Sequence, residues 1–236
     1  RLSGDMLANA LMAGACSVGA NVIYLGILPT PAVAFLAKKH HADAGVVISA
    51  SHNPMEFNGI KFFDGEGFKL PDATEDEIEA EIRSGMKDIV FPTGAGVGKI
   101  TYNFDMRKEY IQNALDLVQV DLTGMKLVMD CAEGASTFTN VDAVRALGAD
   151  LVTMHVDPDG TNINKGCGST HIEELQKRVV EEGADAGLAF DGDADRFLAV
   201  DEKGQVVNGD QIMAIVGKYM KSKGTLNKDT VVVTVM

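Results

Sequence analysis

The sequence predicts an α/β fold with two domains, each a layered α/β/α sandwich around a mixed, mainly parallel sheet. Short apolar runs alternate with amphipathic, helix-length segments along most of the 236 residues. Strands separated by helices of this length pair in parallel through right-handed crossovers. A glycine-rich stretch at 85–103 interrupts the alternation and is the most linker-like segment. We therefore expect one α/β domain at 1–103, a second at 104–228, and the first strand of a truncated third domain at 229–236.

The elements expected in the first domain are a helix at 3–14, a strand at 21–27, a helix at 30–40, strands at 44–49 and 59–63, and an acidic helix from 74. Ser3, Thr30 and Thr74 are candidate caps of the three helices. Glu77 lies three residues after Thr74 and completes a predicted capping box. The apolar run at 46–48 has the profile of a strand buried on both faces.

The elements expected in the second domain are helices at 106–118, 137–147, 170–182 and 209–222, strands at 126–131, 151–156 and 186–191, a hairpin at 196–207, and a strand at 231–236. The last strand stops at Met236 inside an apolar run, and Arg1 begins the chain without a starter methionine. We therefore expect an interior fragment of a longer protein.

The net charge of −13, from 21 basic and 34 acidic side chains, argues against nucleic acid or an anionic membrane surface as partner. An anion site in such a chain must be locally basic or metal-assisted. Cys16, Cys131 and Cys167 include no CxxC pair, which indicates a reducing, cytoplasmic location, inert packing thiols, and neither disulfides nor a zinc site. The sequence contains no run of eighteen apolar residues and no signal peptide.

Polar residues at 49–54, Ser-Ala-Ser-His-Asn-Pro, follow the apolar run at 46–48. The carboxyl end of a strand is where ligands bind in an open α/β sheet. A serine hydroxyl there can carry a phosphoryl group if another group neutralises the charge. Ser49 and Ser51 are alternate residues, so spacing alone does not choose between them. The same residues are also ordinary turn formers.

Three carboxylates, Asp191, Asp193 and Asp195, stand at alternate positions where the strand at 186–191 ends. Alternate residues face one side, so the carboxylates can converge on one oxygen-preferring cation, Mg²⁺, Mn²⁺ or Ca²⁺. One alternative is a calcium loop of the EF-hand kind with Glu202 in twelfth position, although Arg196 stands where that loop needs glycine. The other alternative is a solvated acidic turn.

A serine, a triple-carboxylate ion site and basic groups at Arg1, Lys61 and Arg196 are the parts of a phosphoryl-transfer site. The ion would hold a phosphate oxygen and absorb developing charge. The aspartate-nucleophile pattern of haloacid-dehalogenase-type phosphatases is broken, because Asp195 replaces its Thr or Val. On chemistry alone, a solvated strand residue is the favoured interpretation of Lys61. For His52, a hydrogen-bonding turn residue and a catalytic residue are equally consistent with the sequence.

Taken together, these two stretches resemble the α-D-phosphohexomutase family. Its phosphoserine loop carries Ser-His-Asn-Pro, matched at 51–54, and its metal loop is Asp-Gly-Asp-x-Asp-Arg, matched at 191–196. The stretch GTNINKGCGSTH at 160–171 is similar to the glucosamine branch of the family, as is ISASHNP. The resemblance covers essentially the whole chain except the 85–103 linker. It implies a phosphohexomutase fold that lacks most of the family's third domain and all of its fourth.

The resemblance implies an isomerase-class intramolecular phosphotransferase of amino sugar metabolism. A phosphoserine at position 51 would pass its phosphoryl group to O1 of glucosamine 6-phosphate. The resulting 1,6-bisphosphate would return its 6-phosphoryl group and leave glucosamine 1-phosphate, a precursor of UDP-N-acetylglucosamine and of the cell wall. A hexosamine or glucose 1,6-bisphosphate is the implied activator.

The family's site residues transfer to matching positions of this sequence. The resemblance assigns one Mg²⁺ to oxygens of Ser51, Asp191, Asp193 and Asp195. Lys61 matches the candidate general base and Arg1 a basic residue at the transfer site. His52 would contact the transferring phosphoryl group, and Asn53 and Arg196 would bind substrate or its phosphate.

The family's third domain chooses the sugar, so a sister mutase acting on glucose or mannose phosphates remains the first alternative. A calcium-binding module is a second alternative, of another class. We expect the 236 residues alone to bind Mg²⁺ but to turn over little or no substrate. The expected partner is a phosphorylated amino sugar, with no nucleic acid and no membrane, and a homodimer is compatible with the sequence.

Overall fold

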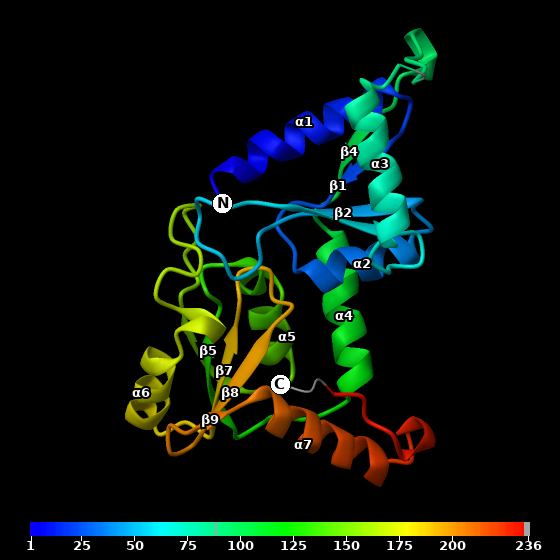
Figure 1. Ribbon diagram of the computed structural model, residues 1–236. Helices are drawn as coiled ribbons and strands as arrows, with labels where there is room; N and C mark the ends of the chain where they lie inside the picture. Colours follow the sequence, from blue (N-terminus) through cyan, green and yellow to red (C-terminus); the bar gives the residue numbers. More distant parts are fainter. Residues whose placement is uncertain (88, 234–236) are drawn as a thin grey trace.

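The computed structural model describes residues 1–87 and 89–233. The first unit contains α1 (Ser3–Ser17), β1 (Val22–Tyr24), α2 (Thr30–Lys39), β2 (Ala44–Ile48), β3 (Ile60–Asp64), α3 (Asp72–Ser84) and β4 (Ile100–Tyr102) (Figure 1). The second unit contains β5 (Lys126–Asp130), α5 (Asn140–Ala146), β6 (Asp150–Met154), α6 (Glu173–Glu182), β7 (Ala186–Phe190), β8 (Phe197–Asp201), β9 (Val206–Val207) and α7 (Gly209–Ser222). Between the two units runs α4 (Met106–Val118).

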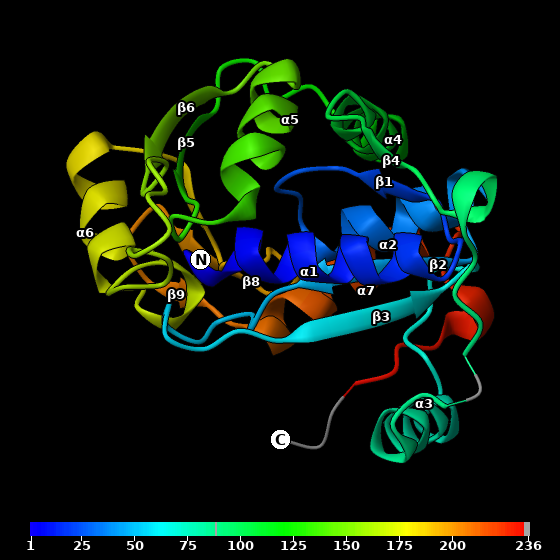
Figure 2. The same cartoon turned by 90° about the horizontal axis from the view of Figure 1, so that it is seen from above.

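The second unit is built on a mixed five-stranded sheet in the order β6-β5-β7-β8-β9. Strand β5 pairs in parallel with β6 and β7, whereas β7–β8 and β8–β9 are antiparallel. Neighbouring side chains of β5 point to opposite faces: Val128 packs with Leu175 of α6, and Met129 packs with Val141 of α5. Figure 2 shows these helices on the two sides of the sheet. The predicted α/β/α sandwich and the hairpin at 196–207 are therefore confirmed.

The first unit contains two small sheets: β2 and β3 pair antiparallel, and β1 and β4 pair in parallel. Helix α2 packs against both β2 and β3. Val47 is buried, but Val46 and Ile48 are only half-buried. The expectation that this run is buried on both faces is thus met only in part. The sheet has only two strands, and one of its faces stays partly exposed at Val46 and Ile48.

The glycine-rich stretch at 85–103 is not wholly a linker. It contains β4, whose Ile100 is in register with Val22 of β1. Periodicity does not reveal this strand, because it has three residues and its partner is distant in the chain. After it, α4 places Met106 in a core cluster with Leu36 of α2, so this helix joins the packing of the first unit as well as that of α5.

The expected caps Ser3, Thr30 and Thr74 are wrong. The residues at the cap positions of α1, α2 and α3 are Leu2, Pro29 and Pro71, and none forms a side-chain cap hydrogen bond. Proline presets the backbone angle that begins a helix, so α2 and α3 start without a capping hydroxyl. The first helix also continues past Gly14 to Ser17.

The apolar run at 231–236 was expected to be a strand. Residues 231–233 lie outside any strand, and 234–236 lie outside the described residues. Among the helices of the described ranges, none combines the length and apolar character needed to cross a membrane.

Candidate active site

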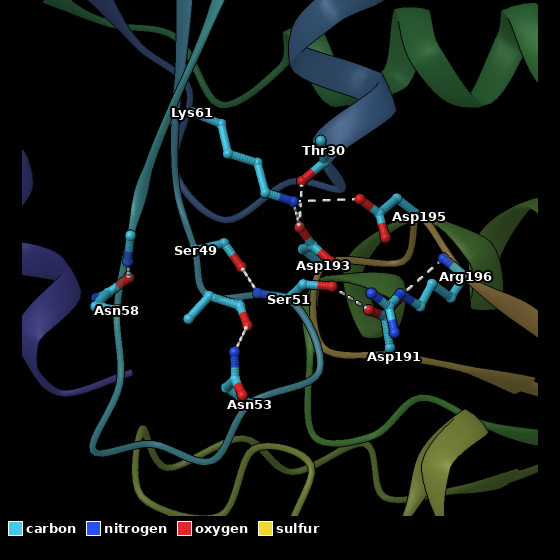
Figure 3. Close-up of polar contacts among 12 residues, drawn as sticks. Thr30, Ser49, Ser51, Asn53, Asn58, Lys61, Asp191, Asp193, Asp195 and Arg196 are labelled. Carbon is cyan, nitrogen blue, oxygen red and sulfur yellow. Dashed lines mark hydrogen bonds and ion pairs between the residues drawn. The ribbon is translucent and has the colours of Figure 1, made fainter. Parts of the chain in front are cut away.

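Two loops from different units face each other in Figure 3. The serine loop, residues 49–54, follows β2, and the aspartate loop, residues 191–196, follows β7. Their closest contact is a 2.6 Å hydrogen bond in which Ser51 Oγ donates to Asp191 Oδ2. Both loops leave the carboxyl ends of strands, where the sequence places them, and tertiary packing brings these ends together.

Only one of the two candidate serines reaches the aspartate loop. The backbone of Ser51 is left-handed (φ 50°), a conformation that costs a non-glycine residue about 1–3 kcal/mol and is concentrated at functional sites. The Ser49 hydroxyl instead lies within its own loop, buried, where it accepts a 3.0 Å hydrogen bond from the backbone N–H of Ser51. The geometry therefore separates two residues that spacing leaves equivalent.

The three carboxylates of the aspartate loop converge as their spacing predicts. One oxygen from each of Asp191, Asp193 and Asp195 lies within 4.8 Å of the others. The side chains of Asp191 and Asp193 are buried. Burial and the neighbouring carboxylates raise the pKa of Asp191. A solvated acidic turn is therefore the wrong interpretation of this loop.

The EF-hand alternative is also wrong. That calcium loop lies between two helices, whereas the aspartate loop joins the antiparallel strands β7 and β8. Glu202, the expected twelfth ligand, lies exposed in the turn between β8 and β9.

Lys61 supplies the positive charge nearest the carboxylates. Its Nζ lies 2.6 Å from Asp193 Oδ2 and 3.2 Å from Asp195 Oδ2. Burial acts to lower the pKa of Lys61, but the hydrogen bonds and charges of these two carboxylates outweigh it, so the pKa is raised. Burial likewise acts to raise the pKa of Asp193, and hydrogen bonds from Lys61 and Thr30 reverse this effect and lower it.

The residues present fit a hard divalent cation. All side-chain donors of the trio are carboxylate oxygens, the ligands that Mg²⁺ prefers. Asp193 uses Oδ2 for Lys61 and Thr30, while its Oδ1 is buried and has no hydrogen-bond partner among the described residues. A buried carboxylate oxygen without a donor is costly unless a cation or water satisfies it.

Arg1 lies against the backbone of the serine loop. Its Nη2 donates to the carbonyl oxygens of Ser51 (2.9 Å) and Asn53 (2.8 Å), and its Nη1 lies 3.4 Å from Ser49 Oγ. Burial lowers the pKa of Arg1, against the charges of the nearby carboxylates. The guanidinium therefore shapes the loop that carries Ser51.

Three other predicted residues sit at the edge of the site. The Asn53 side chain donates to the carbonyl of Ala50, 3.0 Å away, and so closes its own turn. Arg196 contacts Asp191 through its backbone N–H, at 3.1 Å from Oδ1. Within the described residues, Nδ1 of His52 is buried without a hydrogen-bond partner.

Two residues of the site were not predicted as such. Thr30, expected as a helix cap, donates a hydrogen bond from its hydroxyl to Asp193 Oδ2 at 2.6 Å. The backbone N–H of Thr30 donates to the backbone carbonyl of Asp193. Asn164 is buried and left-handed (φ 58°), and its Nδ2 donates to the carbonyls of Ser51 (2.9 Å) and Asn53 (3.0 Å). No local pattern marks Thr30, whereas asparagine in a loop is a mild signal for a left-handed position.

Comparisons with known proteins point to one family. Family models described as phosphoglucomutase/phosphomannomutase, alpha/beta/alpha domains I and II, match residues 1–88 and 108–204. The chain is 57% identical to phosphoglucosamine mutases of Clostridium kluyveri and Clostridium acetobutylicum. Each alignment covers 100% of this chain and 53% of the relative. It thus spans about half the length of the curated relatives it matches.

Solved structures agree with this assignment. A phosphoglucomutase/phosphomannomutase family protein from Burkholderia thailandensis superposes with a TM-score of 0.81 at 26% identity, covering 95% of this chain and 49% of that one. An Aspergillus fumigatus N-acetylphosphoglucosamine mutase in complex with GlcNAc-6P and magnesium shares the fold, with a TM-score of 0.54 at 20% identity over 84% of this chain and 53% of that one.

Proposed function

This chain belongs to the phosphoglucomutase/phosphomannomutase family, and we propose that it is the phosphoryl-carrying part of a phosphoglucosamine mutase. The proposed reaction interconverts glucosamine 6-phosphate and glucosamine 1-phosphate. The choice of sugar rests on the relatives at 57% identity. The observation that carries the chemistry is the 2.6 Å contact between Ser51 Oγ and Asp191 at the buried carboxylate trio.

Ser51 is the proposed phosphoryl carrier. In the forward direction the P–Oγ bond of phosphorylated Ser51 breaks and a P–O1 bond to glucosamine 6-phosphate forms. The O1 proton leaves to a base, and Ser51 Oγ takes up a proton. The resulting 1,6-bisphosphate turns over in the site. Its P–O6 bond then breaks as a P–Oγ bond re-forms, while the Ser51 hydroxyl loses its proton and O6 gains one. This step regenerates phosphorylated Ser51 and leaves glucosamine 1-phosphate.

A phosphoryl group on Ser51 would stand directly against the Asp191 carboxylate, so the site must supply positive charge. Asp191, Asp193 and Asp195 are the proposed ligands of one Mg²⁺, together with an oxygen of the phosphorylated serine. When bound, the ion supplies charge neutralisation for the phosphoryl oxygens. The unpartnered Oδ1 of Asp193 supports this assignment.

Lys61 is the proposed general base. While its Nζ contacts Asp193 and Asp195, its raised pKa keeps it protonated. Lys61 therefore accepts a proton only when these carboxylates are otherwise occupied. In the contact that the structure shows, Lys61 is instead a proton donor and a counter-charge.

The other predicted residues have proposed binding or positioning roles. Arg1 holds the serine loop and adds positive charge at the transfer site. His52 and Asn53 are proposed to contact the transferring phosphoryl group, and Arg196 to bind substrate phosphate. This proposal requires the Asn53 amide to leave the carbonyl of Ala50, to which it is hydrogen-bonded.

We also propose the division into domains at 1–103, 104–228 and 229–236, a cytoplasmic location, and a hexosamine or glucose 1,6-bisphosphate as the activator. The proposed partner is a phosphorylated amino sugar. We expect little or no turnover from these 236 residues in a coupled mutase assay. A turnover rate like that of the relatives would contradict this expectation.

Phosphate mapping tests the proposed function. The chain is incubated with glucose 1,6-bisphosphate and Mg²⁺, and phosphate is located by peptide mass spectrometry. We expect one phosphoryl group on Ser51, lost in Ser51→Ala and kept in the matched control Ser49→Ala. Phosphate on Ser49, or phosphate that persists in Ser51→Ala, would overturn the assignment of the carrier.

A further inference from the structure

A second cluster of metal-ligating side chains lies outside the proposed active site, at Asp130, His155 and Cys167. Asp130 ends β5, His155 follows β6, and Cys167 precedes a short 3-10 turn at Gly168–Thr170. One ligand atom from each residue lies within 4.8 Å of the other two. Asp130 and Cys167 are fully buried, and the His155 side chain is 23% exposed.

The carboxylate of this cluster is held in a fixed orientation. Asp130 Oδ1 accepts a 2.8 Å hydrogen bond from the backbone N–H of Ala132, and Oδ2 accepts one of the same length from Gly168. These donors come from two separate loops. The buried charge is therefore positioned before any further ligand arrives, as in a preorganised site.

The imidazole approaches the carboxylate as a second ligand would. His155 Nδ1 lies 3.1 Å from Asp130 Oδ1, yet this buried nitrogen forms no aligned hydrogen bond among the described residues. Two ligands of one zinc ion, at bond lengths of about 2.0–2.3 Å, lie roughly 3–4 Å apart. The spacing of these two atoms suits a shared ion, and the Cys167 thiol lies within 4.8 Å of a ligand atom of each residue.

The second ring nitrogen of His155 also has a partner of the expected kind. Nε2 lies 3.5 Å from Oε2 of Glu174 on α6. Histidines that bind metals commonly direct their other ring N–H to a carboxylate, which sets the tautomer and ring orientation. The Glu174 carboxylate, on a side chain that is 61% exposed, is close enough to orient the His155 ring in this way.

A catalytic thiol does not account for the cluster. Burial and the charges of Asp130, Glu133 and Glu174 raise the pKa of Cys167 to about 12. The free thiol is therefore protonated at neutral pH and is a poor nucleophile. A thiol with this environment becomes a thiolate when a metal ion binds it.

We propose that Asp130, His155 and Cys167 bind a zinc-like divalent cation. The set of one oxygen, one nitrogen and one sulfur donor suits Zn²⁺ and Co²⁺ and disfavours Mg²⁺. Three protein ligands leave one coordination position for water. The site shares no ligand with the proposed mutase site, and it would tie together the loops after β5 and β6 and the loop that contains Cys167.

This inference differs from the expectation, based on the absence of a CxxC pair, that the chain has no zinc site. Paired-cysteine spacing detects sites whose ligands are close in sequence. Here the three ligands come from three separate segments, which only the parallel pairing of β5 with β6 and the return of the 160–171 loop bring together.

Cobalt spectroscopy tests the proposal. The metal-free chain is titrated with Co²⁺ in excess Mg²⁺, which competes for the aspartate trio. A phosphine replaces any thiol reductant, because a thiol reductant would itself bind Co²⁺. We expect a thiolate-to-cobalt charge-transfer band that saturates at one equivalent and is abolished by one equivalent of Zn²⁺. Cys167→Ala should lose the band, and the matched variant of another buried thiol, Cys131→Ala, should keep it.

His155→Gln provides a second variant at a partly exposed position, in case Cys167→Ala does not fold. It should weaken Co²⁺ binding by about 10-fold or more, with unchanged circular dichroism. Absence of the band in the wild-type chain would overturn the proposal. Persistence of the band in Cys167→Ala, or unchanged affinity in His155→Gln, would do the same.

Discussion

The hydroxyl of Thr30 ties the first unit to the aspartate loop, and its removal gives a sharp test of the contact between the units. In Thr30→Val the side-chain shape is kept but the 2.6 Å hydrogen bond to Asp193 Oδ2 is lost (Figure 3). Both side chains are buried, and a hydrogen bond to a charged group contributes about 1.5–3 kcal/mol. Lys61 still satisfies the same oxygen. We therefore expect the free energy of unfolding to fall by about 2 kcal/mol.

The loss should depend on pH in a defined direction. Burial acts to raise the pKa of Asp193, but the hydrogen bonds from Lys61 and Thr30 hold it below its ordinary value of 3.8. A carboxylate with a lowered pKa contributes stability above its unfolded pKa, and this stability is lost as pH falls through the folded pKa. The difference between wild type and Thr30→Val should therefore be full at neutral pH and should shrink below about pH 3.8.

Urea unfolding in EDTA, followed by circular dichroism, measures both effects. Thr30→Ser is the matched control, because it keeps the hydroxyl and removes one methyl group, a loss of about 0.8 kcal/mol. If Thr30→Val loses no more stability than Thr30→Ser, the hydrogen bond does not contribute as inferred. A difference between wild type and Thr30→Val that does not shrink at any pH below 3.8 at which the folded chain persists would refute the electrostatic part of the reasoning.

The remaining predictions concern the serine loop, the core of the second unit, and the contact of Gly134 with Gly192 in the aspartate loop. Asn164→Ala and Arg1→Ala should each destabilise the chain by about 1–2 kcal/mol. Because both side chains donate to the carbonyls of Ser51 and Asn53, the double mutant should lose more than the sum, and additivity in urea unfolding would contradict this. Leu175→Ala should cost about 2–5 kcal/mol, because Leu175 is fully buried. Its control Leu117→Ala, at a position 78% exposed, should change stability by less than about 0.5 kcal/mol, and equal losses in thermal unfolding would count against the assigned core. A Cβ at Gly134 would clash with the carbonyl oxygen of Gly192. Gly134→Ala should thus cost about 1–3 kcal/mol and weaken Mg²⁺ binding, and an unchanged Mg²⁺ titration would show that the aspartate loop does not depend on this contact.

Local periodicity predicted most of the strands and helices and, within the site, the convergence of the three aspartates. The alternation of apolar runs and amphipathic segments predicts the strands β2, β5, β6 and β7, because strand and helix periods differ and short runs are sufficient to show them. The convergence of Asp191, Asp193 and Asp195 follows from the same rule, since alternate residues of one segment share a side. Polar residues after β2 and β7 indicate where the chemistry lies, because ligands in α/β proteins bind beyond the carboxyl ends of strands.

Tertiary structure alone decided which side chains support this site and which remain in their own loops. Thr30 looks like a helix cap in sequence, but its hydroxyl bonds to a carboxylate 163 positions away. Asn164 and Arg1 bind the same two carbonyls from opposite parts of the chain, and β4 is recognisable as a strand only beside β1. A hydroxyl, amide or guanidinium has the same local signature whatever it binds. Its partner is selected by the packing of distant segments, which no short stretch of sequence encodes.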